Sequence, residues 1–177
     1  RHGALMISRL IRASDSQPGC LTKMFTPNLY IYGGLIEDGE HMQAIDVKPG
    51  TFIGTRNDAV CFKTVDGRGI WITHCRRVKR KTDTALWPKV PAIPLFIHLG
   101  IVDLEKMPQL LPPLPSDFSR LDYPTFQEIF IEYDDTEAGQ RVAYMTFNFY
   151  SGAMSTRQCR QMCAALQSIL DTHTEST

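Results

Sequence analysis

The side chains that could do chemistry include one conspicuous basic run. It consists of Arg76, Arg77, Lys79, Arg80 and Lys81, between Trp71 and Trp87. Cations next to aromatic rings are typical of surfaces that bind RNA or another phosphate-bearing partner by charge and stacking. The alternative is a solvated strand end whose charges prevent edge pairing. The chain has 19 Lys+Arg and 19 Asp+Glu, and this balance favours the second interpretation.

Two histidines lie in apolar stretches, His74 in GIWITHCRR and His98 in PLFIHLGI. Neither has a second His, Asp or Glu at metal-ligand spacing, and no nearby nucleophile would use a general base. We therefore expect structural histidines. Asp134 and Asp135 are adjacent, so their carboxylates point apart, which favours a turn over a shared acid–base site. The sequence predicts neither a complete catalytic site nor a metal site.

A stronger candidate for ligand contact is the junction Tyr150-Ser151-Gly152-Ala153 between a predicted strand and a predicted helix. Small residues allow a ligand to approach the backbone closely, and a helix N-terminus offers free N–H groups. An ordinary turn has the same composition, so the junction alone leaves both interpretations open.

The composition is that of an ordinary globular protein. The chain has 177 residues, of which 43% are hydrophobic and 21% charged, enough for one or two small domains. No CxxC pair occurs, which favours free thiols in a reducing, cytoplasmic setting. No apolar run approaches the length of about 20 residues needed to cross a membrane, so no membrane partner is expected. The five cysteines are Cys20, Cys61, Cys75, Cys159 and Cys163.

The first half of the chain predicts a helix followed by closely spaced strands. The helix covers residues 4–12 and ends before Pro18-Gly19. Asp66-Gly67 predicts a hairpin with a type I′ turn. Short strands without intervening helices favour a small barrel or sandwich. The strands are expected at 29–32, 41–47, 51–54, 60–65 and 69–78.

The second half predicts a proline-rich linker and then a hairpin with a helix. Eight of the eleven prolines lie in residues 84–125, and residues 103–124 are expected to wrap over a neighbouring domain, partly as polyproline. Strands at 126–133 and 141–150 form a second hairpin. The last helix spans about residues 155–170, with Ser155 or Thr156 as N-cap. Both ends of the chain look internal, so we expect a slice of a larger protein.

One segment resembles the folate-dependent formyltransferases. ISRLIRASDSQPGCLT, residues 7–22, is similar to the point where that family leaves its catalytic domain, with Arg9 and Arg12 as its paired arginines and Pro18-Gly19 as its turn. The strands after it resemble the family's small C-terminal barrel, with Gly54, Asp58 and Asp66-Gly67 at the matching turns. The resemblance covers about half of the chain.

A second segment, residues 126–170, resembles the opening hairpin and first helix of the crotonase (enoyl-CoA hydratase) family. Asn148 and Gly152-Ala153-Met154 match that family's pattern, although the loop between them is shorter and lacks its Pro and Lys. The two resemblances in this order are similar to the HoxX-type hydrogenase-maturation family. They imply an enzyme that moves a formyl group from 10-formyltetrahydrofolate to coenzyme A and releases CO for the [NiFe]-hydrogenase centre.

The resemblance implies a mixed α+β chain with four segments. These are the end of a formyltransferase catalytic domain (1–24), an OB-like barrel (25–102), a Pro-rich linker (103–125) and the start of a crotonase-like domain (126–177). The implied partners are the remaining formyltransferase and crotonase-like domains, and the catalytic residues of both families are expected outside this stretch. The chain by itself is therefore expected to be an inactive scaffold. The alternative is the tRNA-binding C-terminal domain of a methionyl-tRNA formyltransferase-like protein.

The implied cofactor-binding residues form two groups. One group lies at the exit of the formyltransferase domain, and the other lies where crotonases lay coenzyme A against backbone. They are Ser14, Asp15, Ser16 and Gln17 in the first group, and Phe149, Tyr150, Ser151, Gly152 and Ala153 in the second.

Overall fold

The computed structural model describes residues 2–137 and 139–174, which divide into two compact units. The first unit contains the residues up to Pro112 together with Tyr123–Phe126. The second contains Pro113–Asp122 and the residues from Gln127 onward. The predicted domain boundaries at residues 24, 102 and 125 follow from the family resemblance and stay predictions.

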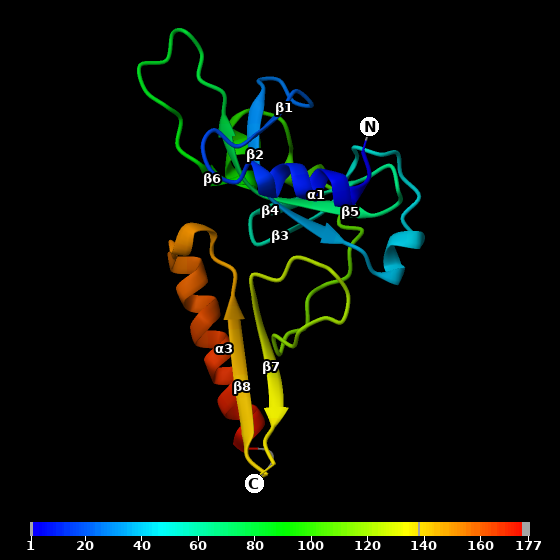
Figure 1. Ribbon diagram of the computed structural model, residues 1–177, viewed down its shortest axis with the longest axis vertical. Coiled ribbons are helices and arrows are strands. Elements are labelled where there is room, and N and C mark those ends of the chain that lie inside the picture. The colour runs from blue at the N-terminus through cyan, green and yellow to red at the C-terminus, as the bar shows by residue number, and fades with distance from the viewer. Residues whose placement is uncertain (1, 138, 175–177) are drawn as a thin grey trace. The chain divides into compact units, whose positions relative to one another are not determined.

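The first unit is built on one antiparallel sheet with the strand order β1-β2-β5-β4-β3, and β6 also pairs with β5 (Figure 1). The mixed class with antiparallel sheets is confirmed. Among the described residues, no pairing joins β1 to β3, so these ladders do not by themselves close a barrel. The strands are β1 Cys20–Thr22, β2 Leu29–Glu37, β3 Phe52–Arg56, β4 Ala59–Lys63, β5 Gly69–Arg77 and β6 Val90–Pro91.

Both faces of the central strands are buried, because side chains alternate between two apolar clusters. On β5, Ile70 and Ile72 join one cluster while Trp71 joins the other. The first cluster also takes Ile11 from helix α1 (Ala4–Ala13) and Phe96 from helix α2 (Ala92–His98). Neighbouring apolar residues in the first half of β5 therefore pack on opposite faces of the sheet, whereas the second half of this strand carries polar and charged residues.

The strand expected at residues 41–47 is wrong. Glu40–Gln43 form a short 3-10 helix, η1, and no strand lies there. Met42, within this turn, and Ile45, two residues after its end, are both buried in the second cluster. The Lys63 ammonium donates a hydrogen bond to the Met42 carbonyl at 2.8 Å, which fixes the end of this turn.

The hairpin at Asp66-Gly67 is confirmed, but its predicted type is wrong. Gly67 has a φ of 82°, whereas Asp66 has no positive φ, so the turn is type I with a glycine bulge. The type I′ turn lies instead between β3 and β4, where Asn57 (φ 47°) and Asp58 (φ 65°) are both left-handed. Asn and Asp tolerate that conformation better than most residues because of their short polar side chains.

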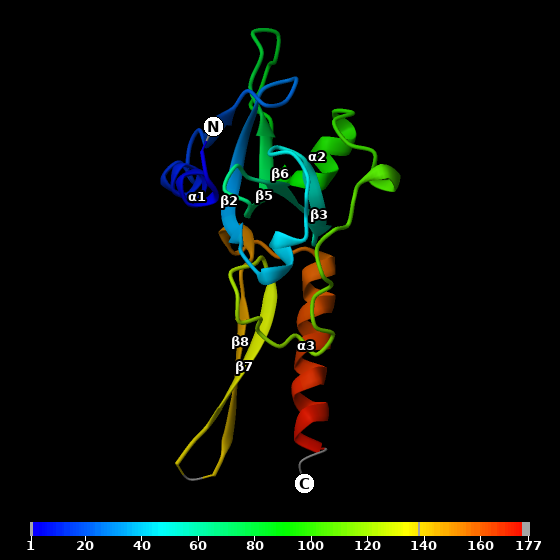
Figure 2. The same cartoon turned by 90° about the vertical axis from the view of Figure 1, so that its right-hand side faces the viewer.

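The second unit consists of a two-stranded hairpin with a helix alongside it (Figure 2). Strands β7 (Ile129–Asp135) and β8 (Arg141–Phe147) pair in register, and a 3-10 turn, η3 (Tyr150–Gly152), leads to α3 (Thr156–Thr174). Ile129, Ile131 and Ala165 form its buried centre. The predicted hairpin and helix are confirmed. A further 3-10 turn, η2 (Leu104–Lys106), belongs to the first unit.

The predicted cap of α3 is confirmed at Ser155. The Gln158 backbone N–H donates to Ser155 Oγ at 3.3 Å, and the Ser155 N–H donates to Gln158 Oε1 at 2.8 Å. This reciprocal pair is a capping box, which satisfies two donors that a helix start would leave open. The Gln158 amide also donates to the buried Glu128 carboxylate, so the start of α3 is tied to the residue that precedes β7.

The carboxylate of Glu37, at the end of β2, is fully buried. It accepts hydrogen bonds from Trp71 Nε1 and Thr125 Oγ1, both at 2.6 Å. His41 Nε2 lies 2.8 Å from its other oxygen, and Arg56 lies 3.6 Å away. A buried carboxylate needs this degree of pairing, because taking it out of water without partners is strongly unfavourable.

The partners of Glu37 fix the short segment Tyr123–Phe126 to the first unit. The Asp38 N–H donates to the Pro124 carbonyl at 2.9 Å. Arg56 donates to Thr125 and to the carbonyl of Phe126, whose ring centroid lies 5.7 Å from that of Trp71. The polypeptide is thus anchored to the first sheet at Tyr123–Phe126, between the two stretches that belong to the second unit.

Replacing Glu37 by Gln should lower the free energy of unfolding of the first unit by about 3 kcal/mol. The substitution keeps the shape of the side chain but leaves the buried Arg56 without its counter-charge. Urea unfolding followed by tryptophan fluorescence measures the change. Asp38→Asn, at an exposed pair with Arg68, is the matched control and should cost less than about 1 kcal/mol. Equal midpoints for the two variants would contradict the assigned role of Glu37.

Candidate functional site

The loop after α1 crosses the sheet close to Tyr32. Helix α1 ends with the Ser14 N–H donating to the Ile11 carbonyl at 3.1 Å. A Cβ on Gly19 would lie 2.5 Å from the Tyr32 ring, and Gly19 also has a φ of 102°, so only glycine fits there. This close passage leaves Asp15, Ser16 and Gln17 exposed.

Arg76 holds this loop in place from β5, where its side chain is only 5% exposed. One guanidinium nitrogen donates to Gln17 Oε1 at 2.8 Å and another donates to the Pro18 carbonyl at 2.6 Å. The Tyr32 hydroxyl donates to the same carbonyl at 2.6 Å. The Arg76 guanidinium also lies over the ring of Tyr30, at 5.2 Å from the centroid. The loop is therefore fixed to β2 and β5 by charge-assisted bonds.

The charges around the loop favour an anion. Lys89 Nζ lies 3.9 Å from the Tyr32 ring centroid, and burial lowers the pKa of this ammonium while Asp15 opposes that shift. Burial also lowers the pKa of His74 to about 4, with Lys89 adding to the effect, so His74 is neutral at pH 7. Two cations, Arg76 and Lys89, thus face one carboxylate, Asp15. The local field suits a ligand with negatively charged oxygens.

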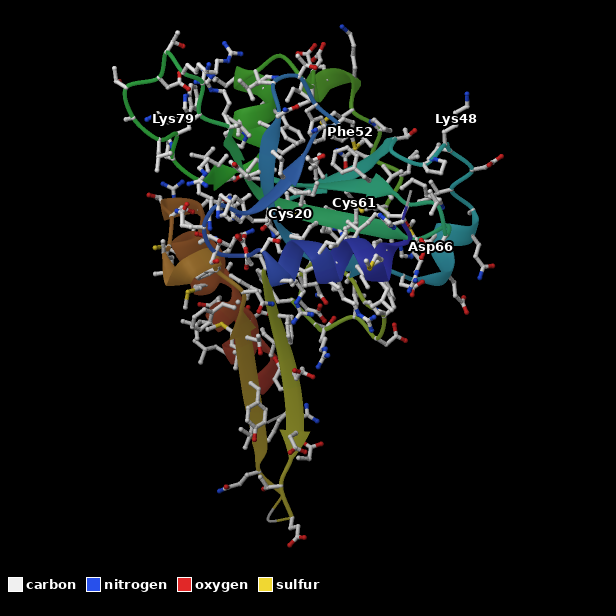
Figure 3. All side chains as sticks on the ribbon, turned by 45° about the horizontal axis from the view of Figure 1, so that its top comes forward. Cys20, Lys48, Phe52, Cys61, Asp66 and Lys79 are labelled. Atoms are coloured by element: carbon white, nitrogen blue, oxygen red, sulfur yellow. The ribbon has the colours of Figure 1, made fainter. Side chains whose placement is uncertain are left out.

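The structure divides the predicted basic run into two parts. Arg77 is 6% exposed, donates to Asp83 at 2.6 Å and lies 4.3 Å from the ring centroid of Trp87. Arg76 is committed to the loop after α1, and only the remaining three cations of the run are exposed. They lie on the long loop between β5 and β6, on which Figure 3 labels Lys79. Sequence reasoning missed the role of Arg76, because its partners Gln17 and Pro18 lie 59 and 58 residues away along the chain.

The second predicted group lies in the other unit, at the turn between β8 and α3. Phe149 packs against Phe147 with ring centroids 5.3 Å apart. The N–H groups of Gly152 and Ala153 donate to the carbonyls of Phe149 (3.2 Å) and Tyr150 (3.3 Å). Two backbone N–H groups of the junction are therefore hydrogen-bonded within the turn itself. The side chain of Ser151 lies outside the described residues.

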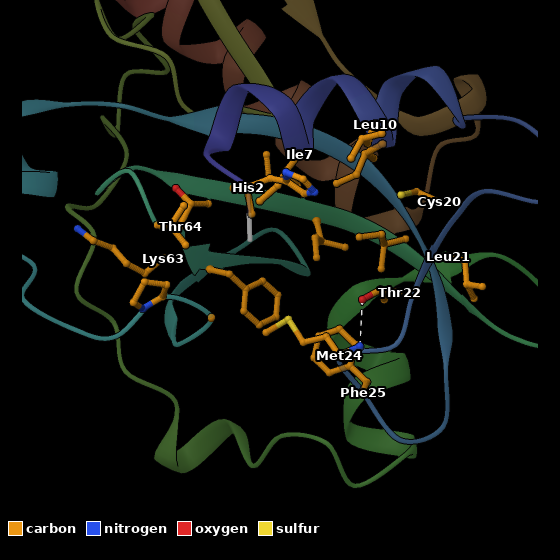
Figure 4. Close-up of a pocket in the computed structure, with 18 residues that line it drawn as sticks. His2, Ile7, Leu10, Cys20, Leu21, Thr22, Met24, Phe25, Lys63 and Thr64 are labelled. Atoms are coloured by element: carbon orange, nitrogen blue, oxygen red, sulfur yellow. Dashed lines mark hydrogen bonds between the residues drawn. The ribbon is translucent and has the colours of Figure 1, made fainter.

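An apolar cavity of about 570 Å³ lies between α1 and the strands (Figure 4). Ile7 and Leu10 line it from α1, and Phe25 lines it from the opposite side. Lys63 also reaches it, but its ammonium donates to the Met42 carbonyl. The half-buried Cys20 lies at its edge, and burial raises the pKa of this thiol, which makes it a poor nucleophile. The lining of the cavity is mainly apolar, although the imidazole of His2 also reaches it.

No described helix is long and apolar enough to cross a membrane. Within residues 2–137 and 139–174, no cluster of three or more His, Cys, Asp or Glu side chains could hold a metal ion.

Comparisons with known proteins support the first half of the prediction directly. Residues 1–87 match the family model of the formyl transferase C-terminal domain. The hydrogenase maturation factor HoxX of Bradyrhizobium diazoefficiens is 26% identical over 173 residues, which cover 97% of this chain and 25% of that protein. The predicted resemblance to HoxX-type proteins is therefore confirmed.

Two crystal structures of HypX variants from Aquifex aeolicus are also similar. Both have a TM-score of 0.62, with 29% and 28% sequence identity. In both cases the matched region is 94% of this chain, and it makes up 25% and 24% of the two HypX chains. The chain thus spans about a quarter of the length of these relatives.

The lowered pKa of His74 predicts a specific pH dependence of stability. Its folded pKa of about 4 lies below the ordinary 6.5, so the unfolded chain takes up this proton first as the pH falls. The free energy of unfolding should therefore decrease between pH 6.5 and 4, by about 1 kcal/mol after allowance for partial exposure. In His74→Gln this component should be absent, which urea unfolding at several pH values measures. If the free energy of unfolding depended on pH in the same way in the wild-type chain and in His74→Gln, the assigned contribution of His74 would be contradicted.

Proposed function

We propose that the chain joins the two halves of a HoxX-type enzyme, and the proposal starts from the match of residues 1–87 to the family model of the formyl transferase C-terminal domain. The similarity to HoxX and HypX along more than nine-tenths of the chain supports this. In the proposal the whole protein moves a formyl group from 10-formyltetrahydrofolate to coenzyme A. A crotonase-like half then releases CO for the [NiFe]-hydrogenase centre.

The observation that carries the proposal is the loop that Arg76 holds at the exit of α1. It exposes Ser16 and Gln17 beside two cations, an arrangement that offers hydrogen-bond donors to ligand oxygens. One of the two solved HypX variants carries alanine in place of an adjacent Ser–Gln pair, among other positions. Ser16-Gln17 is the single Ser–Gln pair in this sequence. We assign it to the substrate or cofactor contact.

The residues present fit the phosphate-bearing coenzyme A better than a neutral ligand. Arg76 Nε is buried without a hydrogen-bond partner among the described residues, and Lys89 lies beside the same loop. The family resemblance implies that the catalytic groups for the formyl transfer lie outside this stretch. In the proposal this chain binds and orients, because binding without a positioned catalytic group does not lower a barrier selectively.

The second unit has a corresponding proposed role as the start of a crotonase-like domain. Residues 149–153 would contact coenzyme A through backbone. The anchoring of Tyr123–Phe126 by Glu37 and Arg56 supports the proposed scaffold role, since it fixes the point where the chain leaves the first sheet.

A second candidate function is RNA contact by the exposed part of the basic run. The loop between β5 and β6 projects from the sheet and carries Lys79, Arg80 and Lys81 on exposed positions (Figure 1). Such a loop would bind phosphates by charge and would weaken steeply with salt.

Coenzyme A should bind to the 177-residue chain in isothermal titration calorimetry, and a double replacement of Ser16 and Gln17 by alanine should weaken binding about tenfold. A loss of this size follows from removing donors to charged oxygens. Lys48→Ala, an exposed lysine of the same unit, is the matched control and should leave the affinity within twofold. Absence of binding to the unsubstituted chain at millimolar coenzyme A would contradict the proposed function.

If the chain binds RNA instead, replacing Lys79, Arg80 and Lys81 together by alanine should reduce the slope of log affinity against log salt by about 2 to 3. Fluorescence anisotropy with tRNA between 50 and 200 mM salt, about the range over which such contacts weaken most, measures this. An unchanged slope, or no binding at the lowest salt, would eliminate the RNA candidate.

A further inference from the structure

The side-chain amide of Gln17 has a fixed orientation. Its Oε1 accepts a hydrogen bond from Arg76 at 2.8 Å. A guanidinium has only donors, so the oxygen of the carboxamide must face Arg76 and its NH₂ group must face away. Gln17 is exposed, and its NH₂ group has no hydrogen-bond partner among the described residues. The amide therefore presents two N–H donors outward.

Arg76 can impose this orientation because it cannot easily turn. It is 5% exposed, its second NH₂ group donates to the Pro18 carbonyl at 2.6 Å, and it stacks on Tyr30. The Tyr32 hydroxyl fixes the same carbonyl from the other side. The planar fork of arginine can hold Gln17 and Pro18 at once, whereas a lysine ammonium would be a single point of contact.

We propose that Arg76 is a positioning residue, which holds the Gln17 amide so that its NH₂ group donates to an anionic oxygen of the ligand. The inference rests on the proposed function, because it names the group that recognises coenzyme A in that site. The surrounding charges support an anionic oxygen, since Arg76 and Lys89 outnumber Asp15. The acceptor is a phosphate oxygen of coenzyme A or a carboxylate oxygen of the folate.

A merely structural role for Arg76 makes a different prediction from a positioning role. Gln17→Glu retains a side-chain oxygen that can accept the hydrogen bond from Arg76. The loop should therefore stay attached to β5, and the melting temperature of the protein should not fall. The same change removes the NH₂ donor. If Gln17 only secures the loop, the added negative charge merely repels the anionic ligand through space, and the loss of affinity should shrink to within twofold in about 1 M salt, where the Debye length is about 3 Å. If Gln17 recognises the ligand, the affinity should fall at least tenfold.

The test combines this variant with Arg76→Lys and Gln17→Met in calorimetric titrations of the 177-residue chain. Arg76→Lys and Gln17→Met should each weaken coenzyme A binding about tenfold, and the double variant should be no weaker than either single one, because both remove one interaction. The inference would be overturned if the affinity loss of the double variant equalled the product of the two single losses, or if Arg76→Lys bound coenzyme A as tightly as the wild-type chain. Pantetheine, which has no phosphate, and 5-formyltetrahydrofolate distinguish the two sources of the oxygen.

A ligand-free readout separates this inference from the proposed function. In the wild-type chain the two NH₂ resonances of Gln17 should be displaced from the positions typical of an exposed glutamine whose oxygen has no fixed partner, and Arg76→Lys should return them to those positions. If the resonances do not move, the positioning role is refuted whatever binds. If the Gln17 resonances move but no ligand binds, the proposed function is refuted, whereas the positioning of the Gln17 amide by Arg76 is supported. Should Arg76→Lys fail to fold, Gln17→Glu on the exposed loop still decides recognition.

Discussion

The antiparallel ladder between β2 and β5 is the constraint on which the rest of the first unit depends. It pairs Tyr30 with Arg76 near one end and Glu37 with Gly69 at the other. Both faces of the sheet are buried, so a charged side chain at either end must find its partners inside the protein. Arg76 finds them in the loop after α1, and Glu37 finds them in Trp71 and Thr125. The burial of these two charged side chains thus fixes the loop after α1 and the segment Tyr123–Phe126.

Patterns within a short stretch of sequence predicted much of this fold. The Asp66-Gly67 hairpin, the first helix and the final hairpin with its helix follow from local turn and period signals. Helix α2 was not predicted, because Pro94 suggests a break, yet proline is tolerated in the first turn, where its missing N–H costs nothing. The turn type at Asp66-Gly67 also escaped prediction, since the type depends on the φ of Asp66, which the tertiary structure decides.

The candidate site could be predicted only in part, for a reason of distance along the chain. The exposed loop was identified from its motif, but the arginine that holds it is 59 residues away from Gln17. The basic run looked continuous in sequence, whereas strand alternation sends Arg76 toward the loop and Arg77 toward Asp83 and Trp87. A run of like charges on a strand with two buried faces cannot act as one surface. Contacts of this kind emerge from the strand pairing and leave no local signal.

The most direct test of the central claim is a nitrogen–proton correlation spectrum of the 177-residue chain during addition of coenzyme A. If Arg76 holds the Gln17 amide toward the ligand, the side-chain NH₂ resonances of Gln17 should shift most, together with the backbone amides of Asp15 and Ser16, and the shifts should saturate. Shifts centred on the loop that carries Lys79, or no shift at the Gln17 amide at saturation, would contradict it.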